Sequence, residues 1–211
     1  MGKDSGYLMD LRIYKILENT KVEGPDNRFC IWVQGCKKHC EGCWAENTWN
    51  FDGGELLSVD KIFNKISKTK DIQGVTFLGG EPFEQAEALA LLAKKIKEIN
   101  LSLVVFTGYI WEELLELNDK NINDLLSYTD LLIDGPFEAN NFDLTRPWVG
   151  STNKRYIFLT DKYSFEDIKD TKNKIEVRID KMGGLFINGM GDFEKIQKSL
   201  YLHYMENKVY F

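Results

Sequence analysis

A strand that passes directly into a helix is encoded by Gly74-Val75-Thr76-Phe77-Leu78-Gly79-Gly80-Glu81-Pro82. The short apolar run before the two glycines predicts a buried strand, and the glycine pair predicts a turn at its carboxyl end. Pro82 fits the first turn of a helix, because its missing N–H costs no hydrogen bond there. Apolar residues then recur at helical spacing from Phe83 to Ile99, so residues 74–99 predict one strand–helix unit.

The same alternation continues on both sides of this unit. Further strands are predicted at residues 11–17, 29–33, 101–106, 130–133 and 155–159, and further helices after Ser58 and at residues 111–117 and 122–127. Strands and helices at this spacing predict an α/β fold, with a parallel sheet wrapped by helices as a doubly wound sheet or a partial barrel. In both forms the active residues lie at the carboxyl ends of the strands.

A smaller unit is predicted after the last of these strands. Residues 174–179 alternate apolar and polar side chains, residues 181–184 offer a turn, and residues 185–188 can return as the second arm of a hairpin. A helical pattern follows at residues 192–207. We therefore expect a core domain over residues 1–160 and a small ββα-like α+β appendage over residues 161–211.

The composition excludes several classes of protein. Of the 211 residues, 43% are hydrophobic and 28% are charged, as in an ordinary globular protein. The net charge of −6 provides no broad positive field for phosphates, so nucleic acid is not expected as a main partner. No apolar run approaches the roughly 20 residues of a membrane span, and Met1 to Asp10 lacks the apolar stretch of a signal peptide. We expect a cytoplasmic protein with no membrane partner.

All four cysteines lie between residues 30 and 43, whereas the cysteines of a disulfide scaffold are spread along the chain. In a cytosolic chain such a cluster indicates metal binding or catalysis. Cys36, Cys40 and Cys43 have the C-x3-C-x2-C spacing that lets one loop hold three corners of an iron–sulfur cube. The fourth iron then stays open to an exogenous ligand.

Other roles for these cysteines remain open. Zinc could bind the same three thiolates, with Cys30 or His39 completing a tetrahedron. Strand alternation places Cys30 on the same face as Trp32 and Gln34. Cys30 is therefore a buried core thiol, a fourth ligand or a redox-active thiol beside the cluster.

The cysteine loop followed by Gly79-Gly80-Glu81-Pro82 resembles the radical S-adenosylmethionine (SAM) superfamily. Within it, the chain is similar to the activating proteins of anaerobic ribonucleotide reductases from about Leu11 to Arg155. The motifs that carry this likeness are Gln34-Gly35-Cys36, Cys40-Glu41-Gly42-Cys43-Trp44, Asn47-Thr48-Trp49, Phe106-Thr107-Gly108-Tyr109, Leu132-Ile133-Asp134-Gly135 and Trp148-Val149-Gly150-Ser151-Thr152-Asn153-Lys154-Arg155. The resemblance implies that the sheet forms a partial (β/α)6 barrel.

The resemblance also implies a reaction. A [4Fe–4S] cluster would cleave SAM reductively to a 5′-deoxyadenosyl radical, which would generate a glycyl radical on a partner such as anaerobic ribonucleotide reductase. Flavodoxin or ferredoxin would supply the electron to this anaerobic oxidoreductase. Because the cofactor does the hard chemistry, no catalytic acid or base is expected among the side chains.

Roles for the two main motifs follow from the same resemblance. The cluster would take three of its ligands from Cys36, Cys40 and Cys43. The methionine amino group of SAM would lie on a ledge at the strand end formed by Gly79, Gly80 and Glu81, where glycine permits a close approach. The alternative for Glu81 is a solvated carboxylate at a helix start, which the helix dipole favours.

Four further residues are candidates for binding SAM. Trp44 would lie against the adenine, with Asn47 nearby, although both could instead serve local packing. Thr107 and Asp134 end neighbouring strands and would hold the methionine carboxylate through a monovalent cation. A strand-end aspartate that caps its own turn is the alternative for Asp134.

The chain departs from the small activating proteins by continuing from Arg155 to Phe211. This extension keeps two other functions open. One is a radical SAM enzyme that modifies a peptide or a small molecule directly. The other is a non-catalytic iron–sulfur or zinc binding module, which would bind its metal with four protein ligands and would not cleave SAM.

Overall fold

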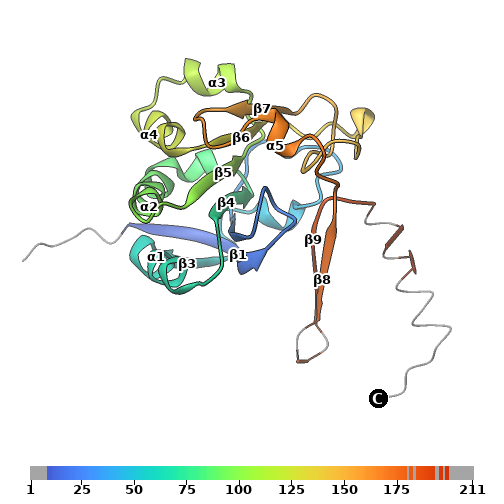
Figure 1. Ribbon diagram of the computed structural model, residues 1–211, viewed down its shortest axis with the longest axis horizontal. Coiled ribbons are helices and arrows are strands. Elements are labelled where there is room, and N and C mark those ends of the chain that lie inside the picture. Colours follow the sequence, from blue (N-terminus) through green and yellow to red (C-terminus); the bar gives the residue numbers. More distant parts are fainter. Residues whose placement is uncertain (1–8, 180, 183, 193–194, 197, 200–211) are drawn as a thin grey trace, which may run out of the picture.

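The computed structural model describes residues 9–179, 181–182, 184–192, 195–196 and 198–199. Its main element is a seven-stranded sheet with the strand order β3-β1-β2-β4-β5-β6-β7 (Figure 1). The strands of this sheet are β1 (Asp10–Thr20), β2 (Arg28–Val33), β3 (Glu55–Ser58), β4 (Gly74–Gly79), β5 (Ser102–Phe106), β6 (Leu131–Asp134) and β7 (Arg155–Phe158).

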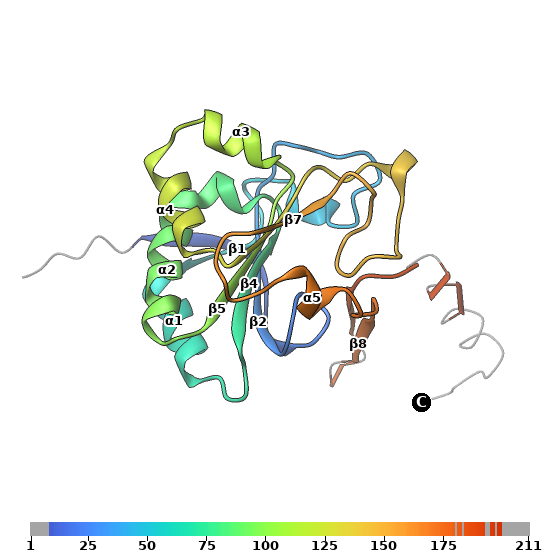
Figure 2. The same cartoon turned by 45° about the horizontal axis from the view of Figure 1, so that its top comes forward.

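Helices cover one face of this sheet, as Figure 2 shows. They are α1 (Val59–Lys68), α2 (Ala86–Glu98), α3 (Trp111–Glu116) and α4 (Lys120–Tyr128). The Ser58 hydroxyl caps α1 by accepting a hydrogen bond from the Lys61 N–H, as its position before the helix predicts. The helix predicted from Phe83 begins as a 3-10 turn, η2 (Pro82–Gln85), before α2. None of the helices in the described part of the chain is long and apolar enough to cross a membrane.

Strands β2, β4, β5 and β6 run parallel to one another, which confirms the predicted parallel core of the sheet. The predicted parallel sheet makes up only the centre of the observed one, because β1 and β7 pair antiparallel with β2 and β6. The connection from β1 to β2 spans only residues 21–27, which suits an antiparallel return and is too short for a helical crossover. The described sheet is open and mixed and does not confirm a six-unit partial barrel.

The two faces of the sheet pack against different neighbours. Phe29, Ile31 and Val33 of β2 point into the core beneath the helices. The alternate residues Cys30 and Trp32 point to the opposite face, where they form a second cluster. This confirms the prediction that Cys30 and Trp32 share one face of a strand. Helices α1 to α4 all lie on the first face, so the doubly wound alternative, which places such helices on both faces, is not confirmed.

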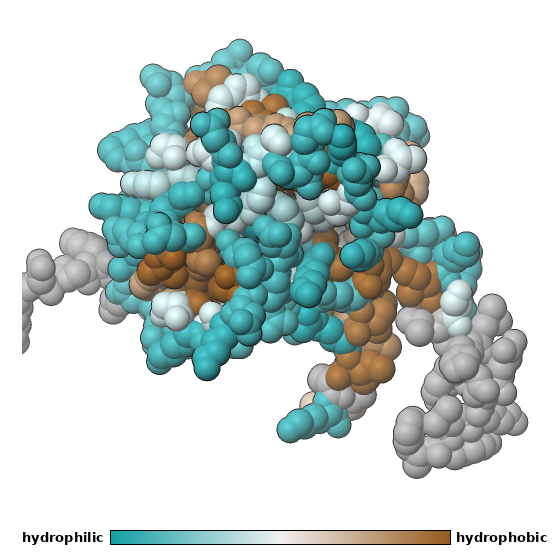
Figure 3. Space-filling view, viewed as in Figure 1, coloured by the Kyte–Doolittle hydropathy of each residue, from teal (hydrophilic) through white to brown (hydrophobic). Residues whose placement is uncertain are grey.

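The C-terminal segment supplies part of the cover on the second face. After α5 (Phe165–Ile168), strands β8 (Ile175–Ile179) and β9 (Leu185–Gly189) pair antiparallel, as the sequence predicts for this hairpin. The Phe186 ring meets the Trp32 ring edge-on at a centroid distance of 5.8 Å. The outer part of the hairpin is apolar (Figure 3), with Ile179 70% exposed. The helix expected at residues 192–207 lies largely outside the described residues.

Candidate functional site

The cysteine loop closes on itself directly after β2. The Gly35 N–H donates to the Thr48 carbonyl at 2.7 Å, and the Cys36 N–H donates to the Trp49 carbonyl at 3.1 Å. The buried Gln34 side chain also donates to the carbonyl of Asn50 at 2.7 Å. These bonds fix both ends of the loop, so its three cysteines are held at the carboxyl end of a central strand.

The glycine pair at the end of β4 lies against the start of this loop. The Gly80 N–H donates to the Val33 carbonyl at 2.9 Å, and the Glu81 N–H donates to the Gly35 carbonyl at 2.8 Å. A Cβ on Gly80 would lie 2.4 Å from the Gly35 carbonyl oxygen, and Gly79 has a φ of +104°. The glycines therefore permit a close approach of two backbone segments, which joins the two motifs.

The two motifs line one cavity of about 130 Å³. Seven predicted site residues contribute to its wall: Cys36, Cys40, Cys43, Gly79, Gly80, Glu81 and Thr107. Cys36 is buried, whereas Cys40 and Cys43 are partly exposed. We call this space the cluster cavity. Residues from three consecutive parallel strand ends thus meet at one point, as the α/β fold predicts.

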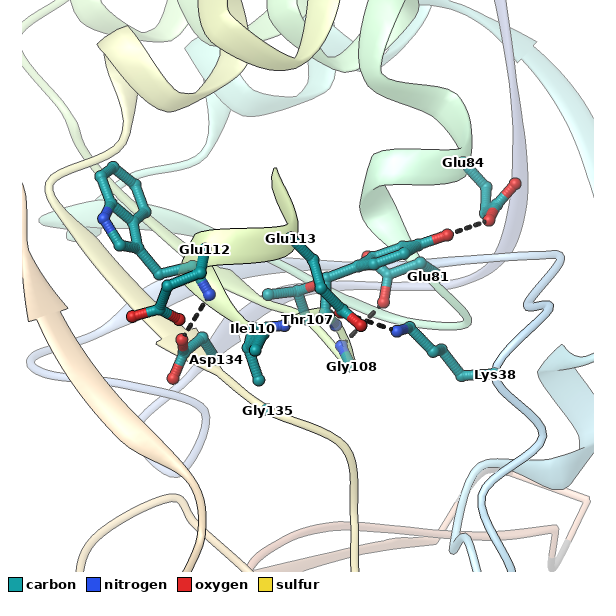
Figure 4. A network of polar contacts seen from close by, with 12 residues as sticks. Lys38, Glu81, Glu84, Thr107, Gly108, Ile110, Glu112, Glu113, Asp134 and Gly135 are labelled. Carbon is teal, nitrogen blue, oxygen red and sulfur yellow. Dashed lines mark hydrogen bonds and ion pairs between the residues drawn. The ribbon is translucent and has the colours of Figure 1, made fainter. Parts of the chain in front are cut away.

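Glu81 is buried at this point and accepts several hydrogen bonds. Its carboxylate accepts from the Thr107 hydroxyl at 2.8 Å, the Gly108 N–H at 2.7 Å and the Phe83 N–H at 3.0 Å. Figure 4 shows how the first two contacts bridge the ends of β4 and β5. Burial raises the pKa of Glu81 to about 7 despite these bonds. The alternative of a solvated carboxylate at this position is wrong, because the side chain is 1% exposed.

Asp134 lies at the end of β6 and is also fully buried. Its carboxylate accepts from the Trp111 N–H at 2.8 Å and pairs with the Arg155 guanidinium at 2.5 Å. Arg155 also pairs with the exposed Glu112 at 2.6 Å. Asp134 therefore joins the ends of β6 and β7 to the start of α3, and it lies outside the wall of the cluster cavity.

The remaining candidates lie beside the cluster cavity. Trp44 and Asn47 line a second, adjoining cavity of about 360 Å³. His39 is exposed and stacks on Trp49 with ring centroids 4.6 Å apart. Cys30 is buried in the sheet with Trp32, so it belongs to the core cluster of the second face.

Two lysines of the cluster cavity were not predicted as site residues. Lys38 pairs with Glu113 at 2.9 Å (Figure 4). Its ammonium group also lies over the Tyr109 ring, 3.9 Å from the ring centroid. Lys154 donates to the Gly135 carbonyl at 2.5 Å, and burial lowers its pKa. Both residues sit in loops without periodicity, so only the fold brings them to the cavity. Lys154 also stands in one of the motifs that carry the family resemblance.

The donor set fits an iron–sulfur cluster. Three thiols from one loop face the same cavity, and the N–H of Ala45 donates to the Cys43 sulfur at 3.4 Å. Burial raises the pKa values of the Cys36 and Cys43 thiols, which metal coordination would counteract by holding the thiolate form. Within the described ranges, no three His, Cys, Asp or Glu side chains converge closely enough to hold a single metal ion. A cubane cluster does not require the side chains to converge on one ion, because each thiolate binds a separate iron.

A match to a known protein family shows where this chain belongs. The family described as a 4Fe-4S single cluster domain matches residues 22–157. The chain belongs to this family. This match includes all four cysteines, the glycine pair and Lys154, and it ends before the C-terminal hairpin.

Relatives of known function agree with this assignment. The anaerobic ribonucleoside-triphosphate reductase-activating protein of Enterobacteria phage T4 is 33% identical over 147 residues, which cover 66% of this chain and 89% of the relative. The protein of the same name from Haemophilus influenzae is 32% identical over 63% of this chain and 88% of its own length. The pyruvate formate-lyase-activating enzyme of Clostridium pasteurianum is 32% identical over 58% of this chain and 50% of its own length.

The relatives confirm the predicted resemblance to radical SAM activating enzymes, so this chain is an enzyme of the glycyl-radical activating type. Among solved structures, QueE from Escherichia coli matches with a TM-score of 0.41 and 17% identity, over 51% of this chain and 57% of that chain.

Proposed function

We propose that this enzyme cleaves SAM reductively and generates a glycyl radical on a partner enzyme of the anaerobic ribonucleotide reductase type. The observation that carries the proposal is the meeting of the three cysteines with Gly79, Gly80 and Glu81 around one cavity. The names of the relatives support the choice of partner, because two of them are activating proteins of anaerobic reductases. We place this activity in the cytoplasm, with flavodoxin or ferredoxin as electron donor.

The cluster would be held by Cys36, Cys40 and Cys43. A cluster bound there would supply the electron for reductive cleavage of a carbon–sulfur bond of SAM. The protein contributes burial on one side, since Cys36 is 8% exposed, and access on the other, since Cys40 and Cys43 are partly exposed. The buried side would shield the cluster from water, and the exposed side would leave access for the substrate.

The polar ends of SAM find complementary charges in the cluster cavity. The ledge of Gly79, Gly80 and Glu81 presents a carboxyl group for the methionine amino group. Lys154 lines the same cavity and bonds a backbone carbonyl, so its remaining N–H groups are suited to the methionine carboxylate. A monovalent cation at Thr107 and Asp134 fits less well, because Arg155 already neutralises Asp134.

The adenosyl group would extend toward the adjoining cavity. Trp44 directly follows the last cysteine, Asn47 lies three residues further on, and both line that cavity together with Gly79. An aromatic ring and an amide suit a purine, which stacks and forms hydrogen bonds at its edge. The loop side of the adjoining cavity is thus our proposed position for the adenosyl group.

The first test is low-temperature electron paramagnetic resonance on anaerobically reconstituted and reduced protein, with and without SAM. We expect about four irons per chain, a spectrum that SAM changes, and formation of 5′-deoxyadenosine. Incubation with a reductase subunit and SAM should then produce a glycyl radical signal on that subunit.

Other outcomes would assign the alternatives. Cleavage of SAM without a radical on any reductase subunit would favour direct modification of a peptide or small molecule. A bound zinc ion, or a cluster whose spectrum ignores SAM, would identify a non-catalytic binding module and overturn the proposal.

A further inference from the structure

The connection from β6 to β7, residues 135–154, begins and ends at the cluster cavity. Phe137 near its start and Lys154 at its end both line that cavity. The Lys154 ammonium group also donates to the Gly135 carbonyl at 2.5 Å, so the two ends of the connection are joined. We call this connection the cavity loop. Its conformation decides where the positive charge of Lys154 lies relative to the three cysteines.

Arg146 holds the backbone that carries Lys154. Its guanidinium donates to the Lys154 carbonyl at 2.9 Å, to the Ser151 carbonyl at 2.9 Å and to the Thr152 carbonyl at 3.1 Å. Its Nε pairs with the Asp143 carboxylate at 3.0 Å. A planar guanidinium presents its N–H groups in a fixed arrangement, so these four acceptors define one position for the end of the cavity loop. A lysine or a glutamine could not reproduce this set of bonds.

Asn173 holds the part of the cavity loop that contains Arg146. Its Nδ2 donates to the carbonyls of Leu144 at 2.9 Å and Arg146 at 2.8 Å, and its Oδ1 accepts from the Trp148 N–H at 2.8 Å. One amide side chain thus satisfies three backbone groups within residues 144–148. Asn173 therefore fixes the main chain on both sides of Arg146, and Arg146 in turn fixes the end of the loop.

The backbone at Trp148 shows why this segment needs support. Trp148 has a φ of +58°, in the left-handed region that is unfavourable for a bulky aromatic residue. Such a conformation persists only where the surrounding structure holds it. Its side chain lies in the same buried cluster as Tyr163 and Ile168, and its N–H is bonded by Asn173. All three of these residues follow β7, so the segment after β7 holds the cavity loop in this conformation.

We propose that Asn173 and Arg146 are positioning residues, which hold Lys154 where its ammonium group meets the methionine carboxylate of SAM. This inference rests on the proposed function and gives the C-terminal extension a role in it. Neither Asn173 nor Arg146 lines the cluster cavity, so both act on SAM through Lys154. Asn173 lies beyond residue 157, where the family match ends. The chain would therefore support a cofactor-binding residue of the shared domain with a side chain from outside that domain.

The test measures the affinity of the full, anaerobically reconstituted enzyme for SAM by equilibrium dialysis. The cluster is kept oxidised, so that SAM binds without being cleaved. Asn173→Ala and Arg146→Gln are each prepared in the wild-type background and in a Lys154→Met background, and iron content and circular dichroism are recorded for every protein. Asn140→Ala is the matched control, because Asn140 is an exposed asparagine of the same loop and is not a hydrogen-bond partner of Arg146 or Lys154.

We expect Asn173→Ala and Arg146→Gln to weaken SAM binding at least fivefold when Lys154 is present and less than twofold in the Lys154→Met background. Asn140→Ala should change the affinity less than twofold in both backgrounds. Should one of the two variants fail to fold, the other decides. Unchanged affinity in either folded variant with Lys154 present, equal losses in both backgrounds, or loss of the cluster from both variants would overturn the inference. Wild-type protein that binds SAM but forms no 5′-deoxyadenosine after reduction would instead contradict the proposed function.

Discussion

At the scale of single residues, the contact between Gly80 and the cysteine loop leaves no room for a side chain. A Cβ on Gly80 would lie 2.4 Å from a backbone oxygen of Gly35. Because backbone atoms cannot move as a side chain can, we expect Gly80→Ala to lower the free energy of unfolding by about 1–3 kcal/mol. The variant should also hold less iron after reconstitution. Urea denaturation and iron analysis measure the two effects.

A second glycine provides the control for this substitution. A Cβ on Gly150 would lie 3.3 Å from a ring carbon of Phe137, which is the end of a side chain that can shift. We expect Gly150→Ala to cost less than about 1 kcal/mol and to leave the iron content unchanged. Equal losses of stability in the two variants would contradict the argument from backbone contact.

The environment of Cys30 predicts that it is not a cluster ligand. Its thiol is fully buried among Leu17, Trp32 and Leu78, and burial raises its pKa well above the usual value. We therefore expect Cys30→Ala to keep about four irons per chain, whereas Cys36→Ala should lose the cluster. Iron and sulfide analysis of both folded variants checks this. Loss of iron from a Cys30→Ala protein with a native circular dichroism spectrum would identify Cys30 as a fourth ligand.

At the scale of elements, Asp134 ties α3 to the edge of the sheet. The carboxylate is fully buried and bonds both the Trp111 N–H and the Arg155 guanidinium. We expect Asp134→Asn to lower the free energy of unfolding by about 1–3 kcal/mol, because it removes a charged acceptor from Arg155. Glu112→Gln is the comparison, since Glu112 meets the same guanidinium from an exposed position and should matter much less. Urea denaturation of both variants measures the two effects. Equal losses in the free energy of unfolding would contradict this prediction.

The elements themselves were largely predictable, and their pairing was less so. Strands β2, β4 and β5 are buried on both faces, so their apolar runs stand out in the sequence. The short edge strand β3 was not predicted, because Glu55-Leu56-Leu57-Ser58 shows no alternation. Among the described strands it pairs only with β1. The direction of an edge strand depends on the length of its connection and on its neighbours, which a local pattern does not contain.

The same limit applies to the candidate site. The cysteines and the glycine pair were predictable, because each motif carries its chemistry in a few consecutive residues. The bond from Thr107 to Glu81 and the arrival of Lys154 beside Cys40 depend on three different strand ends meeting. Such contacts follow from the topology of the sheet rather than from any spacing along the chain.

At the scale of the whole molecule, the sheet separates two kinds of packing. Its helical face is a continuous apolar core, to which polar contacts such as that of Asp134 with the Trp111 N–H are added at the strand ends. The hairpin on the other face is held by buried polar groups as well, since Glu23 accepts from the Gly189 N–H at 2.7 Å and from Asn188. We therefore expect the stability of hairpin packing to depend on pH more strongly than the stability of helix packing on the other face.

The last prediction concerns this response. Burial raises the pKa of Glu23 from 4.5 to about 7, so the folded protein keeps a proton that the unfolded chain releases between these pH values. Rising pH therefore lowers the free energy of unfolding in this window, by about 1.4 kcal/mol per pH unit at most and about 3 kcal/mol in total. In Glu23→Gln the amide oxygen can still accept from the Gly189 N–H, but the side chain no longer titrates. Urea denaturation from pH 4.5 to 8 should show wild type losing stability relative to Glu23→Gln as the pH rises. Parallel curves for the two proteins would show that folding does not raise the pKa of Glu23.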